Sequence, residues 1–218
     1  IGDLNRDGKP DLVVANNLTS TVSVLLGMGD GTFGTKTDFE TGGAPHSVAI
    51  GDLNGNGRLD LAVAVVSSNT VSVLLGNGDG TFGAYRAFAT GREPTSVAIG
   101  DLNRDGRLDL ATANISSNTV SVLLGYGNGT YRPKRDYTAG PAPFSVAIGN
   151  LNGDDSQDLA VTNYGSRSIS IFLGSGDGTL RSRVDYGTGD LPTSVALGDL
   201  NGDSIADVLL GDVNPSGK

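Results

Sequence analysis

Side chains that carry oxygen alternate in the segment DLNRDGKPD near the start of the chain. Asp3, Asn5 and Asp7 stand at every second position, Gly8 follows, and Asp11 closes the segment. Carboxylate and amide oxygens at this spacing can converge on one point, and calcium takes about six to eight oxygen ligands. Glycine at the sixth position allows the positive φ that a sharp turn needs. The chemistry that this segment predicts is calcium coordination.

The same pattern occurs five times along the chain. The copies begin at residues 3, 52, 101, 150 and 199, so each starts 49 residues after the one before. Positions 1, 3, 5 and 9 offer side-chain oxygens, and position 7 offers a backbone carbonyl. The predicted calcium loops span 3–11, 52–60, 101–109, 150–158 and 199–207. The predicted ligands are Asp3, Asn5, Asp7, Lys9, Asp11, Asp52, Asn54, Asn56, Arg58, Asp60, Asp101, Asn103, Asp105, Arg107, Asp109, Asn150, Asn152, Asp154, Ser156, Asp158, Asp199, Asn201, Asp203, Ile205 and Asp207.

Ordinary turn chemistry is the competing interpretation of these loops. Asp, Asn and Gly are common in turns because Asx side chains bond their own backbone. Five copies in register favour metal binding, with up to five calcium ions in a mainly structural role. We expect the first and third loops to bind most strongly. The second has Asn56 and the fifth has Ser204 at positions where other loops have Asp and Gly, and the fourth, with Asn150 and Asp155, is expected to be the weakest.

The elements that position these loops are short strands. In the second repeat, the runs SVAIGDL (47–53), LDLAVAV (59–65), TVSVLLG (70–76) and AYRAFATG (84–91) are separated by turn residues such as Asp-Gly. No segment shows the 3.6-residue apolar period of a helix. Four antiparallel strands per 49 residues predict an all-β fold, a β-propeller with the SVAI strand innermost. An open β-solenoid is the alternative, although its repeats are usually much shorter.

Two further motifs carry a family resemblance. TFG at Thr32–Gly34 followed by GGAP at Gly42–Pro45 resembles the FG-GAP signature, and the pair recurs as TFG and GREP within Thr81–Pro94. The pair weakens to TYR with GPAP and TLR with GDLP in the next two repeats. Together with DLNxDGxxDL, these motifs resemble the FG-GAP and VCBS-type repeats of integrin alpha-subunit head domains and bacterial surface proteins. The resemblance implies a propeller, usually seven-bladed, with calcium in the blade loops and a role in cell adhesion or ligand binding.

The number of blades differs from that of the family. Four full repeats and a partial fifth form a single repeat domain over residues 1–218. Three architectures fit this count: a piece of a longer propeller, a complete ring with few blades, or a unit that closes with a partner chain. We favour a ring or quasi-ring of four or five blades, closed by pairing of the C-terminal and N-terminal strands. Unclosed blades would expose edges that invite self-association.

Composition narrows the classes of function. The net charge of -9 argues against nucleic acid, which requires a basic surface. The sequence contains no run of 18 apolar residues, so no membrane span is predicted. The absence of cysteine excludes thiol chemistry, and the single histidine, His46, has no evident partner for a catalytic triad. No signal peptide occurs in this chain, but the resemblance implies an extracellular or cell-surface location.

The sequence therefore favours a non-enzymatic adhesion or recognition module with a protein or carbohydrate ligand. One alternative is a structural repeat protein that assembles into oligomers or surface fibres. The other is a polysaccharide lyase or hydrolase, since paired carboxylates are plentiful. The tyrosines are candidates for stacking on a sugar or a partner protein, or for packing between blades: Tyr85, Tyr126, Tyr131, Tyr137, Tyr164 and Tyr186.

Overall fold

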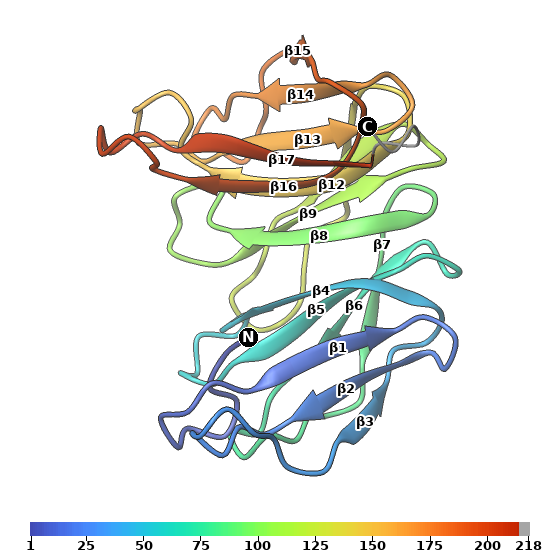
Figure 1. The fold of residues 1–218 in the computed structure, drawn as a ribbon, viewed down its shortest axis with the longest axis vertical. Helices are drawn as coiled ribbons and strands as arrows, with labels where there is room; N and C mark the ends of the chain where they lie inside the picture. Colours follow the sequence, from blue (N-terminus) through green and yellow to red (C-terminus); the bar gives the residue numbers. More distant parts are fainter. Residues whose placement is uncertain (214–218) are drawn as a thin grey trace.

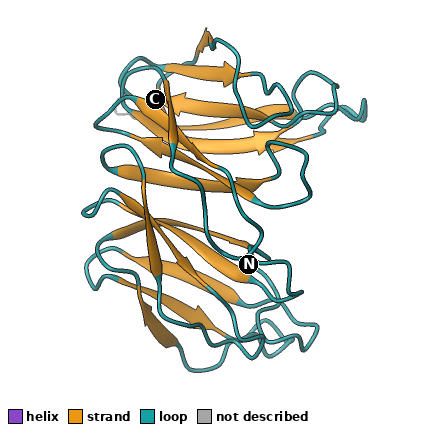
Figure 2. Ribbon diagram, turned by 180° about the vertical axis from the view of Figure 1, so that it is seen from behind, coloured by secondary structure: helices purple, strands orange, loops and turns teal. Residues whose placement is uncertain are grey.

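The computed structural model describes residues 1–213, and every regular element in that range is a β-strand (Figure 2). Consecutive strands pair antiparallel, as short apolar runs separated by turns predict. The helix-free, all-β prediction is confirmed. No membrane-spanning helix occurs among the described residues.

Each 49-residue repeat forms one sheet, which we call a blade. The second, third and fourth blades have four strands in chain order, and the first and fifth blades have three and two. The first blade contains β1 (Leu12–Asn16), β2 (Thr21–Leu25) and β3 (Thr37–Glu40), and the second β4 (Pro45–Gly51), β5 (Asp60–Val65), β6 (Thr70–Leu74) and β7 (Arg86–Ala89). The third contains β8 (Pro94–Gly100), β9 (Asp109–Asn114), β10 (Thr119–Leu123) and β11 (Arg135–Thr138). The fourth contains β12 (Pro143–Gly149), β13 (Asp158–Asn163), β14 (Ser168–Phe172) and β15 (Val184–Gly187), and the fifth β16 (Leu191–Gly198) and β17 (Asp207–Val213).

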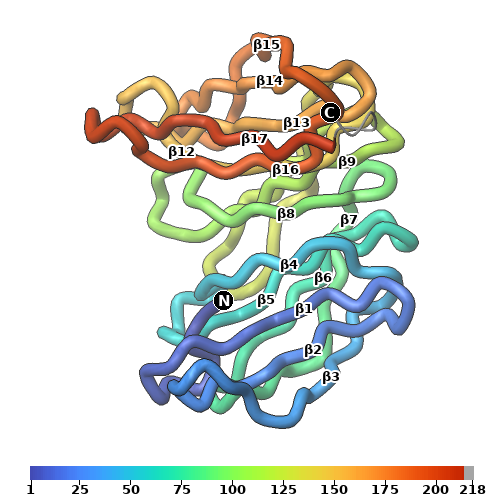
Figure 3. The backbone as a smooth tube through the Cα atoms, in the orientation of Figure 1, coloured from blue at the N-terminus to red at the C-terminus, as the bar shows by residue number. Residues whose placement is uncertain are grey.

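The blades follow one another along the molecule from the first to the fifth (Figures 1 and 3). Within residues 1–213, no sheet contains both β1 and β17, so the closed ring of four or five blades that the sequence favoured is not formed. The C-terminal strand β16 is a first strand, which the first blade lacks, but it pairs with β17 and not with β1. Self-association through these edges stays a prediction.

The first strands of adjacent blades lie side by side, namely β4, β8, β12 and β16. The serine of each SVA run links one of these strands to the next. Ser47 Oγ accepts a hydrogen bond from Val97 N at 3.4 Å, and Ser96 and Ser145 accept from the next blade's valine at 3.2 and 3.3 Å. The prediction that the SVAI strand is the innermost one is confirmed, and its small residues allow this close approach.

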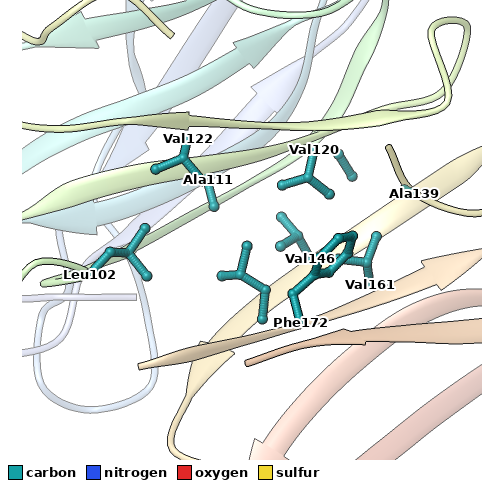
Figure 4. Packing of buried hydrophobic residues seen from close by; sticks show 10 residues of the cluster. Leu102, Ala111, Val120, Val122, Ala139, Val146, Val161 and Phe172 are labelled. Carbon is teal, nitrogen blue, oxygen red and sulfur yellow. The ribbon is translucent and has the colours of Figure 1, made fainter. Parts of the chain in front are cut away.

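The hydrophobic core lies between blades. On β5, Leu61, Val63 and Val65 pack toward the first blade, whereas Ala62 and Ala64 pack toward the third. This alternation follows from the two-residue period of a strand, and it explains why β5 is buried along its whole length. Figure 4 shows the next interface, where Val120 and Val122 of β10 face Val146, Val161 and Phe172 of the fourth blade. Large side chains on one blade thus fill the space beside small ones on its neighbour.

The turn between the second and third strands of each blade contains one residue in the left-handed region. These residues are Ser20, Asn69, Asn118 and Arg167, with φ between 50° and 59°. Asparagine tolerates this region better than other non-glycine residues. The Oδ1 atoms of Asn69 and Asn118 also accept hydrogen bonds, each at 2.8 Å, from the backbone N–H 24 residues later, at Glu93 and Ala142. The turn therefore holds the linker that enters the next blade.

We predict that Arg167→Asn stabilises the protein. Asparagine relieves the left-handed strain, and its amide oxygen would face Leu191 N–H, the equivalent of the two bonded linker positions. The expected gain is about 1 kcal/mol in the free energy of unfolding, measured by urea denaturation. The matched reverse variant, Asn118→Arg, should lose a similar amount. A stability unchanged by Arg167→Asn would contradict this account of the turn.

Candidate functional site

The acidic segments lie where the sequence predicts them, between the first and second strands of each blade. In the first segment, Gly2 and Asp11 form the bridge that closes the loop, and the second loop connects β4 to β5. The 25 predicted ligand residues therefore occupy equivalent loops at one end of the inner strands. The positions of the loops relative to the strands match the prediction.

The first three loops share one hydrogen-bond pattern. In the first loop, Asp3 accepts backbone N–H bonds from Asp7 and Gly8 at 3.1 and 2.9 Å. Asn5 Oδ1 accepts from Asp7 N at 3.1 Å, and Asp7 Oδ1 accepts from Lys9 N at 2.9 Å. The second and third loops repeat these bonds with Asp52, Asn54, Asn56, Asp101, Asn103 and Asp105 as acceptors. The oxygens of positions 1, 3 and 5 thus wrap around the same short stretch of backbone.

The last aspartate of each of the first four loops is a buried clamp. In the third blade, Asp109 Oδ2 accepts from Leu102 N at 2.9 Å, and Oδ1 accepts from Gly125 N at 2.7 Å. One carboxylate thus joins the loop to the end of β10. Asp11, Asp60 and Asp158 make the same pair of bonds, and all four side chains are fully buried. In the fifth blade, Asp207 makes the loop bond alone, to Leu200 N at 2.9 Å.

Burial makes two of these carboxylates, those of Asp60 and Asp109, harder to ionise. Desolvation, helped by the charges of Asp105 and Asp101, raises the pKa of Asp109 to about 6, and the two backbone hydrogen bonds act in the opposite direction. Burial likewise raises the pKa of Asp60, with a contribution from the charge of Asp52. Repulsion within one loop contributes to both shifts, so the carboxylates of a loop sense one another's charge.

The loops also contact the neighbouring blade. Leu4, Leu53 and Leu102, at position 2 of the first three loops, are buried between blades. Their carbonyl oxygens accept hydrogen bonds from a hairpin glycine of the next blade, from Gly80 N to Leu4 O at 3.1 Å and equivalently at 3.2 and 3.1 Å in the next two pairs. The conformation of each loop therefore affects the interface between its blade and the next.

The fourth loop departs from this pattern. Asn150 Oδ1 accepts from Asn152 and Gly153, at positions 3 and 4, whereas Asp101 accepts from positions 5 and 6. The Asn150 side-chain amide also donates to the carbonyl of Asp154. The fifth loop keeps the positive φ at position 6 through Ser204. The oxygens of the first three loops suit a hard cation, whereas the fourth loop presents a donor where a metal needs an acceptor.

The metal ligands themselves stay a prediction. Among residues 1–213, no group of three or more His, Cys, Asp or Glu side chains is placed to hold a metal ion. Amide and backbone oxygens make up the rest of each predicted ligand set, and the carboxylates face backbone N–H groups. Hydrogen bonds from backbone N–H groups to Asx side chains, the competing interpretation from the sequence, are therefore present in every loop. They occur together with the arrangement of oxygens proposed for calcium.

An aromatic cluster lies at the opposite ends of the inner strands. His46 is the second residue of β4 and Phe144 the second residue of β12, and their rings meet edge to face with centroids 5.5 Å apart. Tyr164 adds a third ring, 6.2 Å from Phe144. His46 is exposed, and its Nδ1–H donates to Thr95 O at 2.8 Å. Sequence reasoning missed this cluster because its members come from repeats that lie two apart, and only the residue after each proline hints at it.

The tyrosines divide between the two roles considered for them. Tyr131 is buried between the second and third blades, and within the described residues its hydroxyl has no hydrogen-bond partner. Tyr137 is partly buried and accepts from Leu180 N at 3.2 Å. Four tyrosines are exposed and remain available for contact with a ligand: Tyr85, Tyr126, Tyr164 and Tyr186.

A family model describes most of the chain. The FG-GAP-like repeat matches residues 3–63, 60–112 and 150–210, and the first of these matches includes two consecutive acidic loops. The chain belongs to the FG-GAP-like repeat family. No curated protein matches the chain in sequence.

Solved structures show the FG-GAP-like chain to be a β-propeller. An Agrocybe aegerita lectin that recognises non-reducing terminal N-acetylglucosamine is similar to it with a TM-score of 0.66 and 22% identity, over 96% of this chain and 58% of the lectin. BBS1N, solved in complex with ARL6DN, matches with a TM-score of 0.65 and 14% identity, over 97% and 60% of the two chains. The Pseudomonas aeruginosa periplasmic gluconolactonase PpgL matches with a TM-score of 0.66 and 22% identity, over 88% and 58%. The chain thus spans about three fifths of the length of each of these three structures.

One prediction from the sequence needs correction. The regular repeat, without a distinct catalytic insertion, argued that the chain is not an enzyme. That conclusion is wrong, because the gluconolactonase is an enzyme with the same fold. At 22% identity the likeness shows the fold alone and assigns no reaction to this FG-GAP-like chain.

We predict that the metal-free protein becomes more stable as the pH falls from about 6 toward 4. Asp109 has a pKa of about 6 in the folded state and 3.8 in the reference state, so the folded state binds more protons in this window. The free energy of unfolding should rise by on the order of 2 kcal/mol, allowing for solvent at the loop. Urea unfolding in EDTA at several pH values measures it. Asp109→Asn should remove most of the slope, and a stability that falls throughout the window would contradict the assignment.

Proposed function

We propose that this chain is a calcium-stabilised propeller module for recognition or adhesion, located outside the cell or on its surface. The observation that carries the proposal is the identical arrangement of oxygens in the first three loops, next to the interfaces between blades. Calcium would serve the fold, and the ligand would bind at the other end of the inner strands. The periplasmic location of the gluconolactonase and the family's repeat motif both support a location outside the cytoplasm.

The chemistry of the loops favours calcium over other metals. The predicted donors are all oxygen, which suits a hard cation with flexible geometry, and no cysteine occurs in the chain. In the first loop, Asp3, Asn5, Asp7, the Lys9 carbonyl and Asp11 would hold the ion. Calcium there would neutralise the negative charges of the carboxylates and so relieve their mutual repulsion.

The position of the loops suits a structural role. Each of the first three loops contributes a buried leucine and a carbonyl acceptor to the contact with the next blade. An ion that binds only the folded loop stabilises the whole fold by mass action. Extracellular calcium modules bind with dissociation constants of about 10⁻⁴ to 10⁻³ M, which matches calcium levels outside cells.

We predict that EDTA lowers the melting temperature, and that Asp101→Asn reduces the number of bound calcium ions by one. The asparagine keeps an acceptor oxygen for the loop's backbone N–H groups but removes the charge that attracts the ion. At a free calcium concentration 100 times the dissociation constant, each occupied site contributes about 2.7 kcal/mol. Calorimetric titration counts the ions. Asp79→Asn, in an exposed hairpin outside the loops, is the control and should bind the same number as the parent.

If EDTA leaves the thermal transition unmoved, the structural role of calcium is wrong. If Asp101→Asn and Asp79→Asn bind equal numbers of ions, the third loop is not a calcium site.

The proposed recognition surface is the aromatic cluster of His46, Phe144 and Tyr164. Inner strands such as β4 and β12 run from this cluster to the acidic loops, seven residues away at about 3.3 Å per residue. The cluster thus lies roughly 20 Å from the proposed ions. Exposed aromatic rings supply flat apolar faces with polar edges, which suit a sugar ring or a partner protein. The lectin neighbour supports the carbohydrate alternative.

We predict that Tyr164→Ala weakens binding to a saccharide identified on a glycan array by at least tenfold. Loss of a partly exposed aromatic contact removes stacking area without emptying the core, because Tyr164 is 37% exposed. Tyr186→Ala, on the outer strand β15 and 57% exposed, is the matched control. An array without any binding would argue for a protein ligand. Equal losses in the two variants would remove the aromatic cluster as the recognition surface.

A further inference from the structure

The fourth loop differs from the other four in its backbone. Position 6 has a positive φ in the first three loops, at Gly8, Gly57 and Gly106, and in the fifth, at Ser204. Asp155 stands at this position in the fourth loop and does not adopt it. The sharp turn that brings the oxygens of the other loops together is therefore missing here.

A side-chain amide occupies the interior of the fourth loop. The Asn150 amide nitrogen donates to the carbonyl of Asp154. Asn152 Nδ2 also donates to Asp154 Oδ2 at 2.9 Å, but Asn103 makes the same bond to Asp105 at 3.1 Å in the third loop, so the Asn150 bond is what distinguishes the fourth loop. This N–H group uses an oxygen that would otherwise be free for a cation. A divalent ion requires acceptors only, so the loop satisfies its oxygens internally.

A guanidinium from the third loop covers the fourth. Arg104 Nε donates to Asp155 O at 3.0 Å, and Arg104 Nη2 donates to Ser156 Oγ at 3.1 Å. Ser156 is buried, with 6% of its surface exposed. The two bonds therefore join the third loop to a buried part of the fourth.

Arg104 also packs against the hairpin that follows the fourth loop. In the first three loops, the side-chain stem at position 7 packs against a glycine of the hairpin in the same blade; these residues are Lys9, Arg58 and Arg107. A Cβ at Gly29, Gly78 or Gly127 would lie 3.1, 3.1 or 2.9 Å from that stem. The fourth loop has the short Ser156 at position 7, and Arg104 lies against its hairpin glycine, Gly176, with Nε 3.1 Å from such a Cβ.

We infer that the fourth loop is closed by the Arg104 guanidinium and the Asn150 amide in place of a divalent cation. The guanidinium bonds the Asp155 carbonyl and the Ser156 hydroxyl, and it ties the third and fourth loops together as one unit. The fourth loop then holds its shape with or without calcium. This inference refines the proposed calcium function. It rests on that function only for the expected number of bound ions.

The first test is made in EDTA and is independent of calcium. Arg104→Met should lower the melting temperature by about 3 to 6 °C, because it removes two hydrogen bonds between the loops, one of them to the buried Ser156 hydroxyl. Arg6→Met is the matched control, since Arg6 occupies the same position of the first loop with the same positive φ. It should shift the melting temperature by less than about 1 °C. Equal shifts in the two variants would overturn the inference.

The second test counts calcium ions by calorimetric titration. Asp154→Asn keeps the Oδ1 acceptor of the Ser156 N–H bond, and it should bind as many ions as the parent. The triple variant Arg104→Gly, Asn150→Asp and Asp155→Gly restores the pattern of the other loops and should gain one ion. If Asp154→Asn loses one ion, the fourth loop is a metal site and the inference is wrong. If the parent binds no calcium, the proposed function fails, and the result in EDTA still decides the role of Arg104.

Discussion

The buried aspartate that ends each acidic loop is the interaction on which the blades depend. Each of Asp11, Asp60, Asp109 and Asp158 accepts one N–H from its own loop and one from the glycine that follows the third strand. A hydrogen bond to a charged group contributes about 1.5–3 kcal/mol, and removing the acceptor leaves two buried donors unpaired. The loop, the second strand and the following hairpin therefore form one cooperative unit.

This clamp also links the acidic loops to the packing between blades. The loop that the aspartate closes places a leucine between blades and offers its carbonyl to the next blade's hairpin. Farther along the inner strands, the SVA serines join the blades through side-chain hydrogen bonds. Alternating large and small residues fill the space between sheets. A change in one loop is transmitted to the neighbouring blade because these contacts are contiguous.

Departures from the repeat mark the places where one blade differs from another in its chemistry. In the fourth loop, the loss of glycine and of the first aspartate is accompanied by an arginine that reaches across from the third. At the other end of the inner strands, the residue after the first proline of the strand varies. His46 and Phe144 carry rings that pack together at two of these four positions. The shared residues account for the fold, and the variable ones distinguish its surfaces.

The sequence alone was sufficient for the repeat, the four strands per blade, the innermost SVAI strand and the position of every acidic loop. These features depend on local rules, namely the two-residue period of strands and the turn chemistry of Asp, Asn and Gly. Only the tertiary structure decided that Asp109 bonds a glycine 16 residues later, that Arg104 serves the next loop, and that His46 meets Phe144 two repeats away. It also decided against a closed ring, because the first strand β16 pairs with β17 and not with β1. Such contacts join residues that are distant in sequence, and they depend on how one blade is stacked on the next, which no local pattern encodes.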